Sequence, residues 1–566
     1  MPRICAFFLS VWAWSTPAAA RAPLAAGADD PLLRIAGDEL TRAMGALATR
    51  PDPPYWMGLG VVDREVLEVQ ATHGAAGAIS RSRVRLGDVD VRVGSYALDN
   101  THKLRDAGPF DEPDRPDVDL PLDDAAPAVT AHAFWDAIDA SYRGAARRLI
   151  QVRTNQAVKV DREDRSDDFS PTPAEVDLGA VADAGAGVDP AAWQALVRQA
   201  SAVFLEYPQV HDSNVTLRLQ DDVVYTLTSE GTRVREQRVL VRVAVWGGTV
   251  ADDGMELAVY DYVDAASPGG LPSPAAVVEM AHGVAKQVTA LRAAPVVDPY
   301  VGPAILRGRA AAVFFHEILG HRAEGHRQKD EEEGQTLRDK VGERIFPPFL
   351  SVVDDPTLRR IGAVDLSGHY RFDDEGVAAE RVTLVEDGVY KGFLMSRAPI
   401  EGFAHSNGHG RRQPGAAPVA RQGNLIVSTR NPLPDATLRA ELLKLLKQQG
   451  RPFGLIFDDI SGGFTFTGRS TPNSYAVQPV TVWRVWADGR PDELVRGVDL
   501  IGTPLLTFGR IVAGSQTVEV FNGMCGAESG WVPVSAAAPA LLVSEVEVQR
   551  REKGNDRPPV LPVPAP

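Results

Sequence analysis

The stretch His316-Glu-Ile-Leu-Gly-His321 places two histidines five residues apart, and this spacing restricts the local fold more than any other feature of the chain. Histidines four residues apart on a regular α-helix lie about 40° apart around the axis, so both can reach one metal ion. At a spacing of five, the two rings diverge by about 140°. Convergence on one ion therefore requires a π-bulge, or a helix that opens at Gly320, where glycine provides a flexible backbone.

The motif has a second interpretation, a buried helix whose two histidines are satisfied by hydrogen bonds. A catalytic zinc site needs three protein ligands and an open position for water. Cys525, in FNGMCGAESG, can supply the third ligand as a thiolate, and the flanking Gly523 and Gly526 predict a tight turn that presents it. The spacing leaves four competitors open: Glu324, His326, His405 and His409.

The N-terminal segment MPRICAFFLSVWAWSTPAAARAPLAAGADD has the order of a secretory signal peptide: a basic residue, a short apolar run and small residues at a cleavage site. We expect residues 1–22 to form the signal, with cleavage near Ala20 or Ala22, and the mature protein to be periplasmic or secreted. A disordered apolar N-terminus is the alternative. The apolar run is shorter than the ~20 residues of a membrane span, and we expect no integral membrane segment.

The chain has 2 cysteines, Cys5 and Cys525, and the first lies inside the predicted signal. A mature chain would keep a single thiol and no intramolecular disulfide. An unpaired thiol in an exported protein is reactive unless it is buried or bound to metal. Cys525 is therefore a candidate ligand on this ground too, although a small buried apolar residue is the common role of a free cysteine.

The net charge of −16 argues against a nucleic acid partner, because phosphate contacts need clustered lysine and arginine. The length of 566 residues favours two to four domains. We predict an α+β protein with an N-terminal α/β domain over 23–296 and a β-rich domain over 297–550, followed by a disordered proline-rich tail over 551–566.

The N-terminal domain is expected to contain helices over 30–50, 127–160 and 272–294, the last opened by Ser273 and Pro274. Strand-like runs and a βαβ-like region lie between them, and a charged connector over 160–177 divides the domain into two possible subregions. In the C-terminal domain we expect two helical inserts, one with the HEILGH stretch and one over 434–450 that ends at Gly450.

Several segments, taken in order along the chain, resemble the TldD/PmbA metallopeptidases. The resemblance covers roughly 300–550 and extends more loosely to the strands and helix from about 200. It rests on FFHEILGHRAEGH, VVDDPTL, FDDEGV, NGHGRRQ, ARQGN, DDISGGFTFTG, GVDLIGTP and CGAESGWVPVSAAAPALLVSEVEV.

The resemblance implies that His316, His321 and Cys525 bind zinc and that Glu317 is the catalytic acid/base. It implies hydrolysis of unfolded or small peptides by a metal-activated water, within a shielded channel. It also implies assembly as a homodimer, or as a heterodimer with a related subunit that lacks the metal motif. Because this chain keeps all four residues, it resembles the metal-bearing subunit.

Three further residues are candidates for contacts with the substrate or with a metal ligand, and each has a structural role as its alternative. Arg411 and Arg412 can hold peptide carbonyls or a terminal carboxylate, or can form structural ion pairs. Glu324 can orient a ligand histidine, or can solvate its helix. The segment GLIFDDISGGFTFTG suits peptide binding by strand addition, and ordinary sheet core is the alternative.

The sequence departs from the family in three respects: the first 200 residues match its pattern poorly, His326 stands where a carboxylate is usual, and the signal-like N-terminus is unlike that of the cytosolic members. Two other functions stay open. One is a non-catalytic subunit that binds peptide or assembles with an active partner. The other is a metal hydrolase of another amide, such as a cell-wall peptide or a modified peptide.

Overall fold

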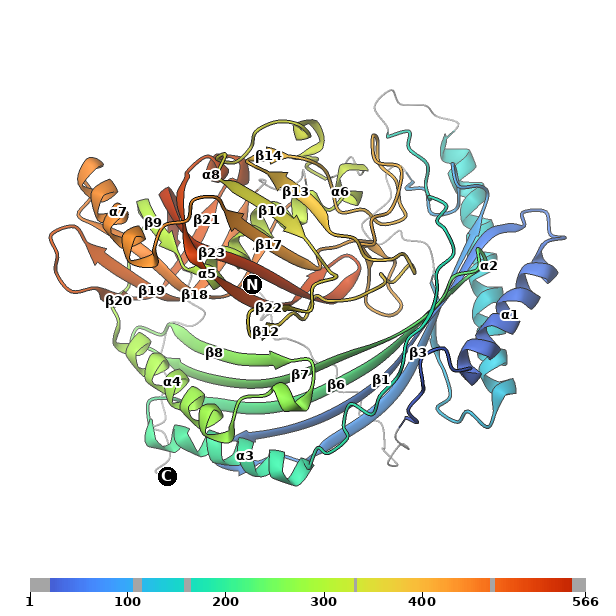
Figure 1. Cartoon of the computed structure of the whole chain (residues 1–566), viewed down its shortest axis with the longest axis horizontal. Helices are drawn as coiled ribbons and strands as arrows, with labels where there is room; N and C mark the ends of the chain where they lie inside the picture. Colours follow the sequence, from blue (N-terminus) through green and yellow to red (C-terminus); the bar gives the residue numbers. More distant parts are fainter. Residues whose placement is uncertain (1–20, 105–114, 157–163, 330–332, 469–473, 552–566) are drawn as a thin grey trace.

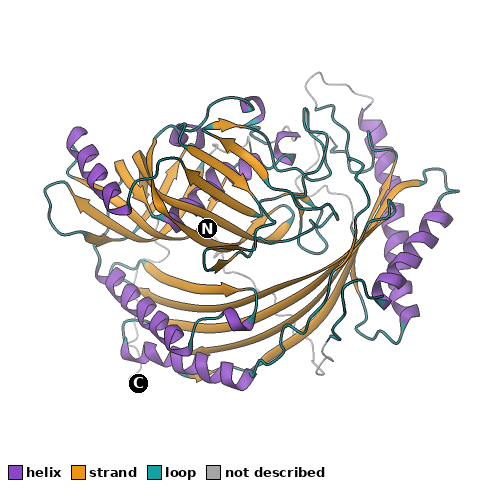
Figure 2. Ribbon diagram, viewed as in Figure 1, coloured by secondary structure: helices purple, strands orange, loops and turns teal. Residues whose placement is uncertain are grey.

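The computed structural model describes residues 21–104, 115–156, 164–329, 333–468 and 474–551, which form a mixed α+β structure with two large β-sheets (Figures 1 and 2). The predicted α+β class is confirmed. Most of the predicted signal peptide and nearly all of the predicted tail lie outside the described residues. No helix in the described part is long and apolar enough to cross a membrane.

The first sheet has eight strands, in the order β4-β3-β1-β6-β7-β5, with β2 paired to β1 and β8 paired to β7. Neighbouring strands run antiparallel, except β5, which is parallel to β7. The strands are β1 (Pro54–Thr72), β2 (Ala75–Ala76), β3 (Ser80–Val93), β4 (Asp117–Asp119), β5 (Val176–Leu178), β6 (Asp212–Thr228), β7 (Arg233–Val250) and β8 (Glu256–Ala265).

This pairing shows that the predicted βαβ-like arrangement is wrong. Strands β6, β7 and β8 follow one another through short turns, which join antiparallel neighbours, whereas parallel neighbours need a crossover of a dozen or more residues. The runs 214–220 and 223–231, expected as separate strands, belong for the most part to the single long strand β6.

Four long helices cover this sheet: α1 (Pro31–Leu47), α2 (Pro127–Gln156), α3 (Pro190–Ala202) and α4 (Pro274–Ala293). The helices predicted over 30–50 and 272–294 are confirmed, and so is the described part of the one over 127–160. The sequence analysis does not predict α3, although Asp189 caps its first turn and a proline follows, a signal that could have revealed it.

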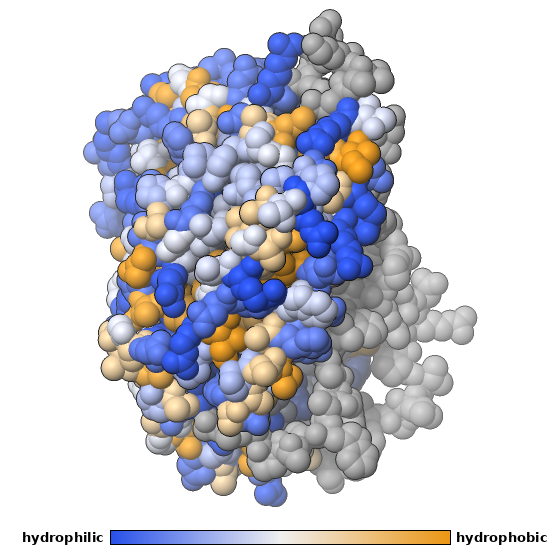
Figure 3. All heavy atoms as spheres, turned by 90° about the vertical axis from the view of Figure 1, so that its right-hand side faces the viewer, coloured by the Kyte–Doolittle hydropathy of each residue, from blue (hydrophilic) through white to orange (hydrophobic). Residues whose placement is uncertain are grey.

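The helices lie on one face of the sheet, with α1 and α2 at one end and α3 and α4 at the other (Figure 1). Leu59 and Val61 of β1 belong to the hydrophobic core under the first pair, and Val69 and Ala71 to the core under the second. These four residues alternate along one strand, so their side chains share a face. The molecular surface at the α1/α2 end is mainly hydrophilic, with scattered hydrophobic residues (Figure 3).

The opposite face of the first sheet lies against the C-terminal part of the chain. On β7, Arg238 donates hydrogen bonds to the Asp374 carboxylate at 3.0 Å and to the Phe372 carbonyl at 2.7 Å. Two residues earlier, Glu236 accepts a hydrogen bond from the Arg371 backbone at 2.7 Å. Helices on one face and the second sheet on the other therefore bury the first sheet on both sides.

The second sheet has eleven strands, in the order β14-β13-β10-β17-β23-β21-β19-β18-β9, with β20 on β19 and β22 on β23. An additional pairing between β23 and β9 closes part of it into a ring. Its strands are β9 (Tyr300–Leu306), β10 (Leu350–Asp354), β13 (Val382–Glu386), β14 (Val389–Tyr390), β17 (Asn424–Thr429), β18 (Phe453–Thr465), β19 (Tyr475–Trp486), β20 (Glu493–Val495), β21 (Val498–Gly502), β22 (Ile511–Ala527) and β23 (Gly530–Arg550).

The largest hydrophobic core forms around helix α5 (Gly308–Phe315), which packs against β18, β22 and β23.

Short paired segments lie outside the sheet: β11 (Arg360–Ile361) with β12 (Val364–Asp365), and β15 (Gly410–Arg411) with β16 (Val419–Ala420). The other helices are α6 (His326–Lys329), α7 (Asp435–Gln448) and α8 (Pro504–Phe508). The helix predicted over 434–450 is α7, and Gly450 follows it with φ of 63°. The domain boundary near 296 stays a prediction.

A cluster of buried charges in the first sheet gives a test of its stability. Asp63 on β1 accepts hydrogen bonds from Arg83 and Arg85 at 2.8 and 2.9 Å, and Arg21 lies 3.4 Å away. Burial by itself would raise the pKa of Asp63, but hydrogen bonding from Arg83 and the charges of Arg21 and Arg85 hold it below its ordinary value of 3.8.

We expect Asp63→Asn to lower the free energy of unfolding by about 3 kcal/mol at neutral pH, because it leaves buried guanidinium groups without their anion. A depressed carboxyl pKa stabilises the fold above the unfolded pKa and ceases to do so as pH falls through the folded one. Urea unfolding should therefore show the same deficit at pH 7 and pH 5, and a smaller one below pH 3.8. The control Asp139→Asn, at an exposed pair with Arg143, should cost under about 0.5 kcal/mol. Equal effects of the two substitutions would contradict this account.

Candidate metal centre

Helix α5 does not continue as a regular α-helix through the HEILGH stretch. Residues His316–Gly320 form a π-helical turn, and a 3₁₀ turn over His321–Ala323 follows. The wider π turn accommodates one extra residue, so the two histidines come to the same side of the helix. Their ring centroids are 4.9 Å apart, with the ring planes at 78°. The predicted π-bulge is confirmed.

Gly320 has a different role from the predicted one. Its φ of −54° and ψ of −56° are ordinary helical values, so the backbone needs no unusual freedom there. A Cβ atom at this position would lie 1.9 Å from Oε1 of Gln422, and the Gln422 amide nitrogen lies 3.4 Å from the His316 carbonyl oxygen. Glycine is therefore required for space, because a neighbouring segment packs directly against the turn.

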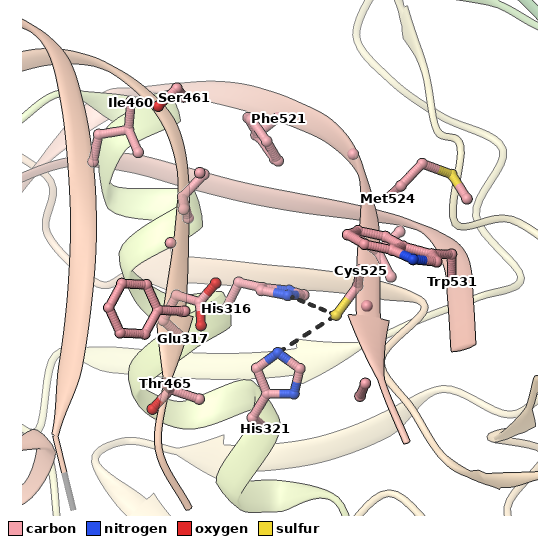
Figure 4. Close-up of a pocket in the computed structure, with 18 of the residues that line it drawn as sticks. His316, Glu317, His321, Ile460, Ser461, Thr465, Phe521, Met524, Cys525 and Trp531 are labelled. Atoms are coloured by element: carbon pink, nitrogen blue, oxygen red, sulfur yellow. Dashed lines mark hydrogen bonds between the residues drawn. The ribbon is translucent and has the colours of Figure 1, made fainter. Parts of the chain in front are cut away.

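Cys525 reaches the two histidines from strand β22 (Figure 4). Its Sγ lies 3.2 Å from Nε2 of His316 and 3.4 Å from Nε2 of His321. The predicted tight turn at the cysteine is wrong, because Cys525 pairs with Val532 inside the β22–β23 hairpin. Gly523 and Gly526 instead leave room for aromatic rings, since a Cβ would lie 2.6 Å from Phe521 and 3.0 Å from Trp531.

These three side chains are the one group of histidine, cysteine and carboxylate donors in the described residues whose ligand atoms, within 4.8 Å of one another, could hold a metal ion. In a tetrahedral zinc site the nitrogen and sulfur ligands lie about 3.5 Å apart, which matches the observed separations. A thiolate with two imidazoles is a donor set that suits zinc. The residues present therefore fit a zinc ion.

The four competing ligands lie outside this group. Glu324 contacts His321 on the side away from the sulfur, through Nδ1 at 3.1 Å. His326 pairs with Glu528, and the buried His409 lies 3.3 Å from the Asp354 carboxylate. The structure therefore favours Cys525 as the third ligand.

Glu317 follows the first histidine and is buried, with 5% of its surface exposed. Burial raises the pKa of its carboxyl group above the ordinary value, although the neighbouring histidines oppose this. Its Oε2 atom is buried and has no hydrogen-bond partner among the described residues. A Cβ at Gly463 of β18 would lie 2.7 Å from its Cγ, so the strand backbone passes directly beside this side chain. The unpartnered oxygen is available to a water molecule or a substrate.

A buried polar network orients the second histidine. The Glu324 carboxylate lies 3.1 and 3.2 Å from Nδ1 of His321 and accepts a hydrogen bond from Arg327 at 2.8 Å. Despite complete burial, the charges of His321 and Arg327 lower the pKa of Glu324 to about 2. Arg421 lies 3.6 Å from Glu324 and donates to the Cys525 carbonyl at 2.7 Å. The network fixes both a histidine and the cysteine, which agrees with the orienting role predicted for Glu324.

The Cys525 thiol and the two imidazole rings shift one another's pKa values. Burial would raise the pKa of Cys525, but the adjacent His321 and His316 lower it well below its ordinary value. Burial would likewise lower the pKa of His321, yet Glu324 and Cys525 raise it well above its ordinary value. The site therefore favours a charged thiolate, the form of cysteine that binds metal.

Arg411 and Arg412 do not lie at the three candidate metal ligands. Arg411 donates to the Gln422 carbonyl at 2.6 Å and lies over the Tyr370 ring, and Arg412 pairs with Asp88 at 2.6 Å. Neither residue lines the cavity at the three ligands. Both make the structural contacts that were the alternative interpretation, so we do not propose direct substrate contacts for them.

A cavity of about 560 Å³ opens at the three ligands and Glu317. The first sheet supplies part of its lining through Arg242 of β7 and Tyr260 and Tyr262 of β8, and α5 supplies Arg309. None of these four residues is among those predicted from the sequence. Arg309 could have been found, because it precedes His316 by seven residues and so lies on the same helix face. The other three come from a segment whose place beside the site depends on how the two sheets pack.

Comparison with known proteins agrees with this geometry. Residues 300–550 match the PmbA/TldA metallopeptidase C-terminal domain. A protein of Archaeoglobus fulgidus named metalloprotease is 30% identical over 239 residues, which are 42% of this chain and 51% of the relative. The metalloprotease TldD homolog of Haemophilus influenzae is 29% identical over 254 residues, or 44% of this chain and 48% of the relative. The chain thus spans about half the length of the curated relatives it matches.

The solved structure of TldE from Thermococcus kodakarensis is similar to 91% of this chain and 100% of its own, with a TM-score of 0.59 at 14% identity. That likeness extends to the N-terminal sheet, but at this identity it concerns the fold alone. The order of motifs, the matched C-terminal domain and the shared fold lead to one assignment. Residues 300–550 therefore form a C-terminal domain of the PmbA/TldA metallopeptidase type, and the curated relatives that match this part of the chain are named metalloproteases.

Proposed function

We propose that the protein is a zinc-dependent peptidase that hydrolyses unfolded or small peptides. The observation that carries this proposal is the convergence of His316, His321 and Cys525 beside Glu317, at the edge of one cavity. Two ring nitrogens and a thiolate would hold a zinc ion with three protein ligands, the number that catalytic zinc sites have. The unpartnered Oε2 of Glu317 gives the cavity a base beside these ligands.

Zinc on these ligands would supply a water of lowered pKa and an electrophile for the scissile carbonyl. Glu317 accepts the proton of the attacking water and then delivers it to the leaving amine. Burial raises the pKa of Glu317 toward the working pH, which suits a group that both takes and returns a proton. Glu324 holds the His321 ring in place through Nδ1, so that Nε2 faces the metal position.

Strand β18 supports peptide binding by strand addition. One edge of β18 pairs with β19, and β9 covers the other edge only at Leu455–Phe457. Residues 461–465, beyond that short pairing, line the cavity. Backbone groups of β18 can therefore pair with an extended peptide that passes Glu317, and this mode of recognition tolerates many sequences. A cleavage survey with strict side-chain preferences at several positions would contradict it.

Export of the protein is a further part of the proposal. Arg21 follows the predicted cleavage site at Ala20, and its backbone N–H donates to Glu65 at 2.7 Å. Its guanidinium group lies 3.2 Å from Asp221 and 3.4 Å from Asp63. A chain that begins at Arg21 would place its charged amino group on the Glu65 carboxylate, a favourable position for a new N-terminus.

Glu317→Gln should reduce peptide cleavage by about 10²- to 10⁴-fold, because the amide cannot accept the proton of water. Mass spectrometry of a library of unstructured peptides measures cleavage, and elemental analysis measures retained metal. The control Glu528→Gln changes a carboxylate in the same cavity that is already held by His326 and Arg327, and should reduce cleavage less than tenfold. Full activity of Glu317→Gln would exclude this mechanism. If the wild type and Glu317→Gln both bind zinc but neither cleaves peptides, the related subunit that the family resemblance implies is added and the assay is repeated.

Glu324→Gln should weaken zinc binding by about tenfold to a hundredfold, because the His321 ring loses the anion that orients it. Competition with a chelator gives the affinity directly, without an activity assay. Glu333→Gln is the matched control, since Glu333 also pairs with Arg327, at 3.1 Å, whereas Glu324 contacts Nδ1 of the ligand His321 as well. An unchanged affinity in Glu324→Gln would show that the carboxylate does not support the ligand.

N-terminal sequencing of the protein from the envelope or medium of its native host should begin at Arg21 or Pro23, after cleavage near Ala20 or Ala22. A start at Arg21 agrees best with the contact between its backbone nitrogen and Glu65. Recovery of the intact chain from Met1 in the cytoplasmic fraction would contradict export.

A further inference from the structure

A second cavity, of about 470 Å³, lies next to the metal-site cavity. Tyr260 of β8 and Ser461 of β18 line both cavities, so the two spaces meet at these residues. The second cavity lies between the N-terminal sheet with its helix α4 and strands β18 to β21 of the C-terminal sheet. Its volume is in the range of sites that bind small ligands or side chains.

The walls of this second cavity are mainly apolar. Side chains of both sheets and of α4 contribute: Trp246, Leu257, Leu291, Val480, Val482, Val495 and Val498. One polar group stands out, because Nδ1 of His211 is buried without a hydrogen-bond partner among the described residues. Burial, with a contribution from Arg292, lowers the pKa of His211, so its ring is neutral at neutral pH. His211 thus offers one neutral hydrogen-bonding atom beside the apolar contacts. The charged residues Asp212, Glu256, Arg496 and Arg551 also line the cavity, where Arg496 pairs with Asp253 and Arg551 with Asp499.

Strand β18 sets the distance between the two cavities. Gly463 lies beside Glu317, and Ser461, two residues earlier, borders the second cavity. Two residues of chain span at most about 7 Å, and Ser461 lies at an irregularity of the β18–β19 pairing, between Ile460 and Gly462. A peptide that pairs with β18 would therefore place a side chain at the second cavity two or three residues from the bond beside Glu317.

We propose that the second cavity is a subsite for an apolar side chain of the substrate, located two or three residues from the scissile bond and on one side of it only. The inference rests on the proposed peptidase function and names its substrate class: extended peptides with a large apolar residue at this one position. At the other positions the edge of β18 pairs with the peptide backbone and does not distinguish side chains. One position therefore dominates an otherwise broad specificity.

A set of ten-residue peptides of serine and glycine, each with phenylalanine at a different position, tests the proposal. Cleavage by the wild type gives kcat/KM, and fluorescence anisotropy with the inactive Glu317→Gln variant gives Kd. Burial of one phenylalanine corresponds to about a tenfold to hundredfold gain in kcat/KM and in affinity over a peptide of serine and glycine alone, and the cleaved bond should lie a fixed two or three residues from the phenylalanine. Tighter binding of the phenylalanine peptides without any cleavage would uphold the subsite and remove the peptidase function. Cleavage at no fixed distance from the phenylalanine would uphold the peptidase and overturn the subsite.

Ala258→Trp tests the location of the subsite. Ala258 is exposed and lines the second cavity but not the first, so an indole there should fill the space without disturbing the metal ligands. The variant should lose the preference for phenylalanine while it keeps zinc and cleaves the peptide without phenylalanine at the wild-type rate. Ala76→Trp, at an exposed position of β2, is the matched control and should keep the preference. A preference that survives in Ala258→Trp would overturn the assignment.

Discussion

The π turn at His316–Gly320 is the constraint on which the site depends. Without it, histidines five residues apart would point to different sides of α5, and no single ion could contact both. A π turn is less favourable than an α-helical one, so the surrounding structure has to hold it. Gln422 packs against Gly320, and Arg322 donates hydrogen bonds to the Glu317 carbonyl at 2.8 Å. The turn is thus held from both sides, by a packed side chain and by an added hydrogen bond.

Opposite charges stabilise the buried network behind His321 and Cys525. Glu324 is fully buried, which is unfavourable for an isolated carboxylate, but Arg327, Arg421 and His321 surround it. Arg421 also donates to the Cys525 carbonyl, so one guanidinium group connects the anion behind His321 with the strand that carries the thiolate. Because these groups have lost their water, removal of Glu324 would take from His321 and Arg421 the carboxylate that both face, and would disturb the geometry of the ligands.

The N-terminal sheet contributes to the site as well as to the fold. One of its faces is covered by helices, and the other supplies Arg242, Tyr260 and Tyr262 to the metal-site cavity. The Tyr262 hydroxyl donates to the Asn522 carbonyl, three residues before Cys525, and the guanidinium groups of Arg242 and Arg309 lie 4.5 and 5.3 Å from the centre of its ring. Residues that precede the matched segment 300–550 therefore line part of the cavity beside the metal ligands.

The sequence by itself determined the features that depend on near neighbours. The spacing of His316 and His321 indicated a departure from the regular α-helix, Ser273 and Pro274 marked the start of α4, and Gly450 marked the end of α7. The tertiary structure decided the rest. It placed Cys525 in a strand rather than a turn, gave Gly320 a packing role, paired the N-terminal strands antiparallel and brought Tyr260 beside the metal ligands. Helix caps and turns depend on a few adjacent residues, whereas these contacts join segments far apart in the chain and exist only once the two sheets have packed.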